Sequence, residues 1–214
     1  MKNSLLLFVA LLSLGLGAVV YHFYHKPEMP EYALYYSQPR AIKPFQLTDQ
    51  QGQPFTKQNL LHQWSWLFFG YTSCPDVCPT TLQELNYRYP ALKKIANNTQ
   101  VIFVSVDPKR DSQTKLKKYI HYFNSAFIAL RGEHTELYPF ARNLGLMYAI
   151  VEPKDKATGD NYLVEHSASI VLVNPQGNIS AIFRPKQAVG EVPSVDGVKM
   201  VSDFAKIVAL YSAQ

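Results

Sequence analysis

Both cysteines of the chain lie in one short segment, YTSCPDVCP at residues 71–79. An apolar run at residues 64–71 predicts a buried strand before this segment, and a helix is predicted after it. The segment therefore falls at the carboxyl end of a strand, where α/β folds build their sites. The amino terminus of a helix stabilises a thiolate and lowers the pKa of a thiol. Cys74 and Cys78 are thus candidates for a nucleophile, a redox pair or a pair of metal ligands.

The C-x-x-x-C spacing of the two cysteines narrows these candidates only in part. Residues four apart on a helical turn have Cα atoms about 6 Å apart, which is within reach of a disulfide and lets both sulfurs face one ion. A purely structural disulfide would close a loop of about five residues and contribute only roughly 2 kcal/mol. The spacing also differs from the C-x-x-C redox motif. A third group is needed to decide between redox and metal chemistry.

The elements that must position the cysteines alternate between strands and helices. The pattern predicts a hairpin, then β, α, β, α, β and α elements, then a second hairpin and a final helix, which is typical of an α/β domain with a central sheet. A β-α-β beginning joined to a terminal β-β-α unit predicts a thioredoxin-like fold with an N-terminal hairpin extension. Pro90 is expected to kink or split the first helix. The expected strands lie at 45–56 (hairpin), 64–71, 100–106, 127–130, 146–151, 169–173 and 178–184, and the expected helices begin near 79, after a cap at Asp111, near 137 and near 196.

His166 is the strongest candidate for the third group. It stands in YLVEHS, residues 162–167, just before the predicted strand at 169–173. In a thioredoxin-like sheet the loop before that strand faces the cysteine loop. Two thiolates and one imidazole form a soft ligand set that suits Cu(I) and can hold Cu(II), whereas zinc would want a fourth ligand or water. The remaining histidines are expected at a membrane interface (His22 and His25) or in surface and packing positions (His62, His121 and His134).

Two acidic residues are expected near the cysteine segment. Asp76 lies between the cysteines, and Asp107 ends the second buried strand, whose carboxyl end should neighbour them. Each could support the site from outside the ligand set, or simply cap a helix or form a turn. Tyr71 and Trp66 are expected in the core or at the rim of the site rather than in its chemistry.

The N-terminal segment is expected to anchor the chain in a membrane. Residues 4–20 are apolar and uncharged and are followed by aromatic residues, so the stretch reaches about 20 residues and could span a bilayer as a helix. A cleaved signal peptide with a site near residues 15–18 is the alternative. The pattern predicts a bacterial inner-membrane protein with a single span and a periplasmic domain. The expected divisions are an anchor at 1–25, a linker at 26–41 and a domain at 42–214.

The composition of the chain excludes several classes of protein. The chain has 214 residues, 47% of them hydrophobic and 17% charged, which excludes a disordered, collagenous or coiled-coil chain. The formal charge of +5 is mildly basic. This charge fits a membrane-proximal surface or an acidic partner, and the basic runs are expected to be solvated helix faces rather than a nucleic-acid site.

Several separate motifs together resemble the Sco (also called SenC) family of membrane-tethered, thioredoxin-like copper-binding proteins. They are GYTSCPDVCPTTL at 70–82, SVDPKRD at 105–111, YLVEHS at 162–167 and NPQG at 174–177. The resemblance runs from about residue 41 to 212 and implies that Cys74, Cys78 and His166 bind one copper ion, as Cu(I) or Cu(II). Glu165 departs from the pattern, because the family usually has Asp before the histidine.

The resemblance implies a metallochaperone rather than a conventional enzyme. Such a protein would deliver copper by ligand exchange to the copper centre of cytochrome c oxidase, with the copper-accepting subunit of a terminal oxidase as its partner. The alternative is a thiol–disulfide oxidoreductase that uses Cys74 and Cys78 as a redox pair to reduce the cysteines of the acceptor site. A peroxiredoxin-like peroxidase would have no clear use for His166. The spacing and the absence of a proline at 166–168 favour copper.

Overall fold

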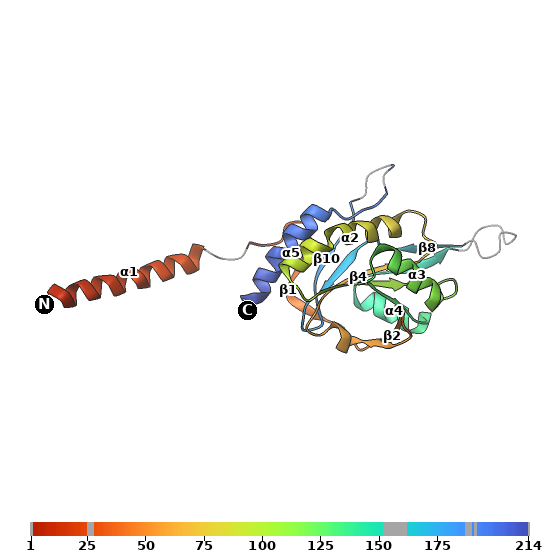
Figure 1. Ribbon diagram of the computed structural model, residues 1–214, viewed down its shortest axis with the longest axis horizontal. Helices are drawn as coiled ribbons and strands as arrows, with labels where there is room; N and C mark the ends of the chain where they lie inside the picture. The colour runs from red at the N-terminus through yellow and green to blue at the C-terminus, as the bar shows by residue number, and fades with distance from the viewer. Residues whose placement is uncertain (1, 25–27, 152–161, 187–189, 191, 214) are drawn as a thin grey trace.

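The computed structural model describes residues 2–24, 28–151, 162–186, 190 and 192–213. An N-terminal helix, α1 (Lys2–Tyr24), precedes the folded domain (Figure 1). Within the described residues, no helix meets the length and apolarity needed to cross a membrane. The membrane anchor stays a prediction. His25 and the first residues of the expected linker, 26–27, lie outside the described part of the chain.

The domain is built on one mixed sheet of eight strands in the order β1-β10-β9-β4-β5-β6-β2-β3. The central strands β4, β5 and β6 are parallel, and the other pairs in the sheet are antiparallel. The strands are β1 (Leu34–Ala41), β2 (Gln46–Asp49), β3 (Pro54–Thr56), β4 (Trp64–Gly70), β5 (Thr99–Ser105), β6 (Ile128–Arg131), β9 (Ile170–Val173) and β10 (Asn178–Phe183). This arrangement is the α/β, thioredoxin-like fold expected from the alternation of elements.

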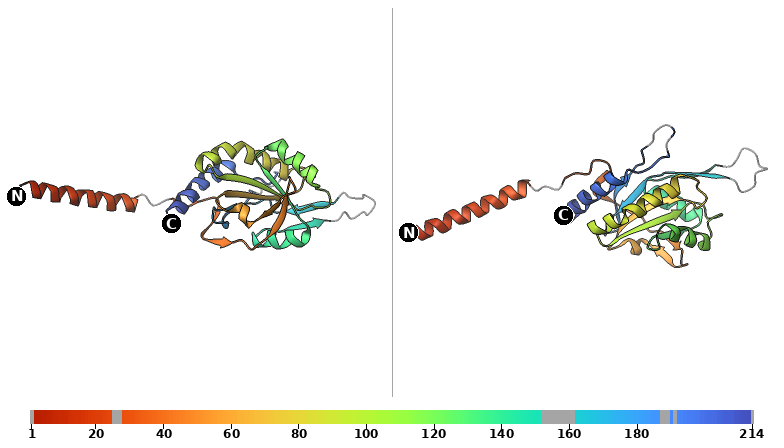
Figure 2. Two further views of the ribbon diagram at one scale, coloured as in Figure 1. Left: turned by 60° about the horizontal axis from the view of Figure 1, so that its bottom comes forward. Right: turned by 45° about the horizontal axis from the view of Figure 1, so that its top comes forward.

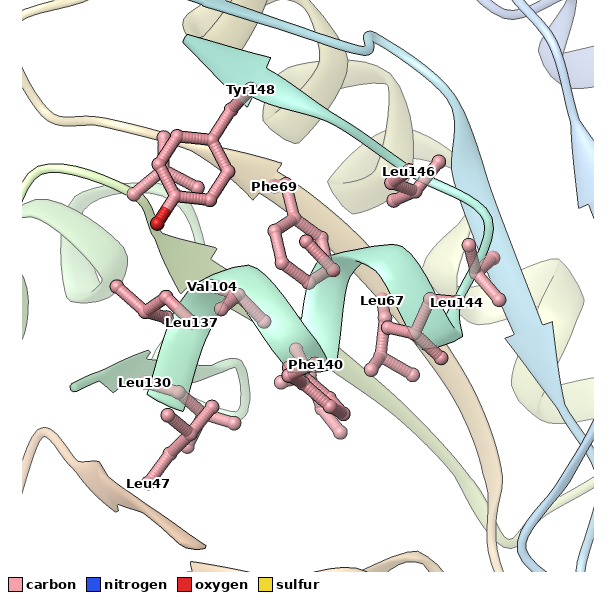
Figure 3. Packing of buried hydrophobic residues seen from close by; sticks show 14 of the residues in the cluster. Leu47, Leu67, Phe69, Val104, Leu130, Leu137, Phe140, Leu144, Leu146 and Tyr148 are labelled. Carbon is pink, nitrogen blue, oxygen red and sulfur yellow. The ribbon is translucent and has the colours of Figure 1, made fainter. Parts of the chain in front are cut away.

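Helices cover both faces of the sheet (Figure 2). Successive side chains of a strand point to opposite faces, so Trp66 and Phe68 pack in one apolar cluster and Leu67 and Phe69 in the other. The first cluster includes residues of α2, α3 and α5, and the second includes residues of α4 (Figure 3). The helices are α2 (Val77–Ile95), α3 (Gln113–Phe123), α4 (His134–Asn143) and α5 (Gly197–Ser212), with a short 3₁₀ helix, η1 (Lys57–Leu60).

Pro90 does not split α2, which was one of the two effects expected from the sequence. The helix continues as one element from Val77 to Ile95. A proline removes one intrahelical hydrogen bond, but Leu82, Leu85 and Leu92 on both sides of it are fully buried. Packing against the sheet therefore holds the two halves of the helix in one element.

The expected linker is partly a strand. Residues 34–41 form β1, which pairs with β10 at the edge of the sheet and carries an irregularity between Tyr35 and Arg40. An edge strand tolerates Pro39 because it has a neighbouring strand on one side only, so not every backbone N–H is needed for a hydrogen bond in the sheet. Residues 34–41 of the expected linker are therefore an irregular edge strand of the sheet.

A separate two-stranded sheet carries the histidine. Strand β7 (Tyr148–Val151) pairs antiparallel with β8 (Leu163–His166), and Tyr148 is the partner of His166. The extended piece expected at 146–151 is present as β7. The segment that ends in His166 was expected to be a loop and is instead a strand, so His166 sits at a fixed register position.

Candidate metal centre

The two cysteines occupy the turn between β4 and α2, as the sequence predicted. Cys74 is half-buried in the loop, and its backbone N–H donates to the Tyr71 carbonyl at 3.2 Å. Cys78 lies in the first turn of α2 and is completely buried. Both are free thiols.

Gly70, the last residue of β4, makes room for the buried sulfur. A Cβ atom at this position would lie 2.5 Å from Cys78 Sγ and 2.8 Å from Phe103 Cε2. Real Cβ atoms do not approach other atoms so closely, so this close contact of strand and helix requires a residue without a side chain. The glycine in the GYTSCP segment is thus part of how Cys78 is positioned.

His166 completes a compact group of three ligand atoms. Its Nε2 lies 3.3 Å from Cys78 Sγ and 4.0 Å from Cys74 Sγ. The three atoms all lie within 4.8 Å of one another. The structure thus brings together the three residues selected from the sequence, and the chemistry of their donor atoms fits a soft metal ion.

The other nitrogen of His166 is held by the backbone. His166 Nδ1 lies 3.3 Å from the Ser167 carbonyl oxygen, and a carbonyl can only accept, so Nδ1 carries the proton in this contact. The lone pair of Nε2 is then available on the side of the sulfurs. The rings of Phe68 and Tyr71 stand edge-on at 6.0 Å from the imidazole and restrict its rotation.

The two thiols differ strongly in acidity. A hydrogen bond from the Cys78 thiol lowers the pKa of Cys74 to about 4, against the opposing effect of burial. Burial raises the pKa of Cys78, and the hydrogen bond that its thiol makes with Cys74 raises it further. The reduced pair therefore carries one negative charge at neutral pH, on the more accessible sulfur.

Asp111 holds the cysteine loop in place, a role that the sequence did not reveal. Its buried carboxylate accepts hydrogen bonds from the Thr72 N–H at 3.0 Å, from the Thr72 hydroxyl and from the Ser105 hydroxyl at 2.7 Å. The sequence suggested that Asp111 caps α3, but Ser112 is the capping residue and accepts from Lys115 N–H. The hydrogen bonds to Thr72 fix the loop two residues before Cys74.

Asp107 supports the hairpin that carries His166. The Tyr162 hydroxyl and Arg110 Nε both donate to the buried Asp107 carboxylate. Arg110 also donates to the Tyr162 carbonyl at 2.8 Å, and its guanidinium lies 3.7 Å from the centre of the Tyr162 ring. The same carboxylate also accepts from the Arg110 backbone N–H at 3.3 Å, so Asp107 both forms the turn after β5 and supports the hairpin of His166.

The other residues selected from the sequence lie outside the ligand group. The side chain of Asp76 makes no capping hydrogen bond at the start of α2. Trp66 is fully buried in the core, and Glu165 is exposed beside His166. Tyr71 is buried and contributes its ring edge to the wall of the site.

His62, His121 and His134 belong to no group of possible metal ligands in the described part of the chain. His62 lies in a loop with positive φ, and His121 is exposed on α3. His134 packs on α4 with its Nδ1 2.8 Å from the Tyr148 hydroxyl. Their surface and packing positions agree with the expectation from the sequence.

Together, the fold and the site define a thioredoxin-like domain with two thiols and one imidazole arranged for a metal ion. The SCO1/SenC family model matches residues 35–195. The chain belongs to the SCO1/SenC family, as the motifs indicated.

Individual relatives agree with this assignment. A protein of Stutzerimonas stutzeri is 38% identical over 146 residues, which cover 68% of this chain and 70% of that protein. The mitochondrial SCO2 protein of Saccharomyces cerevisiae is 37% identical over 143 residues, covering 66% of this chain but only 47% of that longer protein. The crystal structure of Arabidopsis thaliana ScoI with copper bound has a TM-score of 0.67 and 29% identity, and covers 79% of this chain and 99% of that one.

Proposed function

We propose that this protein is a copper-binding metallochaperone that serves assembly of the copper centre of cytochrome c oxidase. The observation that carries the proposal is the group formed by Cys74, Cys78 and His166, whose ligand atoms lie within 4.8 Å of one another. Family membership and the copper bound in the Arabidopsis relative support the choice of metal.

The chemistry of the three donors explains why copper would be held and yet released. Two sulfurs and one imidazole nitrogen suit Cu(I), which accepts three soft ligands, and also permit Cu(II). Cys78 is buried, whereas Cys74 and His166 are half-buried. An acceptor can therefore reach two of the three ligands from solvent and take the ion by ligand exchange, without transfer of an electron.

The proposed setting is the outer face of a bacterial inner membrane. The apolar, uncharged residues 4–20 support a single N-terminal span, with residue 2 and the amino terminus on the cytoplasmic side. The domain would then face the periplasm, where the copper-accepting subunit of a terminal oxidase is the partner.

Deletion of the gene from the organism that carries it tests this function. We expect membranes of the deletion strain to have reduced cytochrome c oxidase activity, which the wild-type protein and added copper salts both restore. Cys78→Ser should fail to restore it, while His121→Ala, a histidine outside the ligand group, should restore it fully. Normal oxidase activity in copper-limited deletion cells would contradict the proposal.

A second candidate function rests on the unequal thiols. Cys74 combines a pKa of about 4 with partial exposure, and Cys78 is a buried free thiol beside it. The Cys74 thiolate could attack a substrate disulfide, and Cys78, after losing its proton, could displace the substrate to leave a Cys74–Cys78 disulfide and two substrate thiols. His166→Ala separates the two functions, because it removes a copper ligand and leaves both thiols.

A further inference from the structure

A cleft of about 450 Å³ opens beside His166. It lies between the first turn of α2, the segment that joins β8 to β9, and the segment that follows β10. The residues that line it are Val77, His166, Ser167, Ala168, Ser169, Arg184, Pro185 and Pro193. Because His166 belongs both to the cleft and to the ligand group, a molecule bound against His166 lies next to the metal centre.

Arg184 brings a positive charge to the cleft. Among the described residues that line the cleft, none is acidic. The Arg184 guanidinium makes no hydrogen bond or ion pair with any residue that the structure describes, and only its carbonyl is engaged, by the Tyr32 hydroxyl at 2.6 Å. The neighbouring cation, Lys186, is instead paired with Asp196 at 3.2 Å. The Arg184 guanidinium is suited to bind a carboxylate through paired hydrogen bonds.

Further polar groups line the cleft between His166 and strand β9. The hydroxyls of Ser167 and Ser169 lie 2.9 Å apart and line the same wall. Ala168 stands outside both ladders, since the pairing of β8 ends at His166 and that of β9 begins at Ile170. A bound ligand therefore meets hydroxyls and main-chain groups between the imidazole and the strand.

We propose that this cleft receives a thiol ligand that carries a carboxylate, with its carboxylate on Arg184 and its sulfur at His166. The inference rests on the proposed function. A soft ligand is required because only a thiolate competes well for an ion held by two sulfurs. The incoming sulfur forms a bond to Cu(I) as the His166 bond breaks, the proton of the thiol passes to solvent, and copper keeps its oxidation state.

Two small thiols, one with and one without a carboxylate, test the inference on the copper-loaded full chain. The rate at which 3-mercaptopropionate removes Cu(I) is compared with the rate for 2-mercaptoethanol, which lacks the carboxylate. We expect Arg184→Gln to slow removal by the acid about two- to fivefold, the worth of one exposed ion pair, and to leave removal by the alcohol unchanged. Lys186→Gln, the control, should change neither rate, and high salt should abolish the difference. Equal effects of Arg184→Gln on both thiols, or no effect, would overturn the inference.

A measurement without copper keeps this inference separate from the proposed function. In the reduced, metal-free protein, 3-mercaptopropionate should shift the backbone amide signals of Ala168 and Ser169 more than 2-mercaptoethanol does, and Arg184→Gln should remove that excess. If copper does not bind at all, the proposed function is wrong, and the amide shifts still show whether the cleft binds the thiol acid. If copper binds normally and neither readout prefers the acid, the cleft inference alone falls.

Two sources share this ligand chemistry. Glutathione represents a free thiol acid, and an acetylated hexapeptide with one cysteine and one aspartate represents a segment of an acceptor protein. Both are compared at equal concentration in wild type and Arg184→Gln. The ligand whose rate of Cu(I) removal falls more strongly in Arg184→Gln identifies the source as a free thiol acid or as a segment of an acceptor protein.

Discussion

At the scale of single residues, the site depends on the different surroundings of two chemically identical thiols. Cys74 and Cys78 are only four positions apart, yet one is half-buried and the other completely buried. Their spacing and the position of His166 could be predicted from the sequence, because a short motif fixes them. The difference in acidity could not, since it arises from burial and from the hydrogen bond between the two thiols.

The first prediction concerns the pH dependence of thiol alkylation. The pKa of Cys74 is lowered to about 4 and that of Cys78 is raised. A thiolate is the reacting species, so iodoacetamide should modify Cys74 at a nearly constant rate between about pH 5.5 and 8 in the reduced, metal-free protein. In Cys78→Ala the hydrogen bond to Cys74 is lost, so the midpoint of the profile should move to higher pH. The measurement is mass-spectrometric labelling against pH.

The matched control is Cys74→Ala, which retains only the buried thiol. Cys78 should stay unmodified up to about pH 8, since burial raises its pKa and limits access. Rapid labelling of Cys78, or a Cys74 rate that rises steeply around pH 8, would contradict the assigned asymmetry.

At the scale of elements, the segment after β5 supports both halves of the site. Asp111 bonds the cysteine loop through Thr72, and Asp107 bonds the hairpin of His166 through Tyr162. The sequence pattern suggested a cap for Asp111, because an acidic residue just before a helix is typical of one. Its true partner lies 39 positions earlier in the chain, which local reasoning cannot detect.

The second prediction is that Asp111→Asn disturbs both stability and copper affinity. An amide at this buried position retains one acceptor oxygen and turns its NH₂ group towards the Thr72 and Ser105 donors. We expect the free energy of unfolding to fall by about 2 kcal/mol, the worth of a charged hydrogen bond, and Cu(I) to bind about tenfold more weakly. Denaturant unfolding and a chelator competition measure these two quantities.

Asp196→Asn provides the comparison for this variant. Asp196 caps α5 through Lys199 N–H, far from the cysteines in sequence, and asparagine is also a good N-cap. This variant should keep nearly wild-type stability and copper affinity. If Asp111→Asn behaved in the same way, the assigned role of Asp111 would be wrong.

At the scale of the whole molecule, the layered fold could be predicted from the sequence, but the edge strand β1 of the sheet could not. The alternation of apolar strands and amphipathic helices determines the sheet and its two covered faces. The edge strand β1 pairs with β10, so Leu34 lies opposite Ile182. Contacts over such sequence distances leave no local pattern, and for this reason the sequence suggested a linker where the structure has a strand.

The third prediction concerns how the segment before β1 is fastened to α5. The buried Asp203 carboxylate accepts from the backbone N–H groups of Glu31, Tyr32 and Ala33 at 3.0, 2.7 and 2.7 Å. Asp203→Ala should release this segment and lower the free energy of unfolding by about 2–3 kcal/mol. Hydrogen exchange at residues 31–33 should accelerate, while copper affinity stays unchanged.

Lys206→Gln on the same helix is the control for this variant. Among the described residues, Lys206 pairs with the exposed carboxylates of Glu28 and Glu31, so its loss should leave the exchange at residues 31–33 close to wild type. Slow exchange there in Asp203→Ala would show that other contacts hold the segment.

The most direct test of the metal centre is an anaerobic titration of the reduced full chain with Cu(I) against a competing chelator. We predict one equivalent bound tightly by the wild type. His166→Ala should weaken binding by about tenfold or more, since the loss of a ligand exceeds that of a supporting residue, and His134→Ala should not weaken it. Weak binding by the wild type, or equal affinity in His166→Ala, would contradict a copper site made of Cys74, Cys78 and His166.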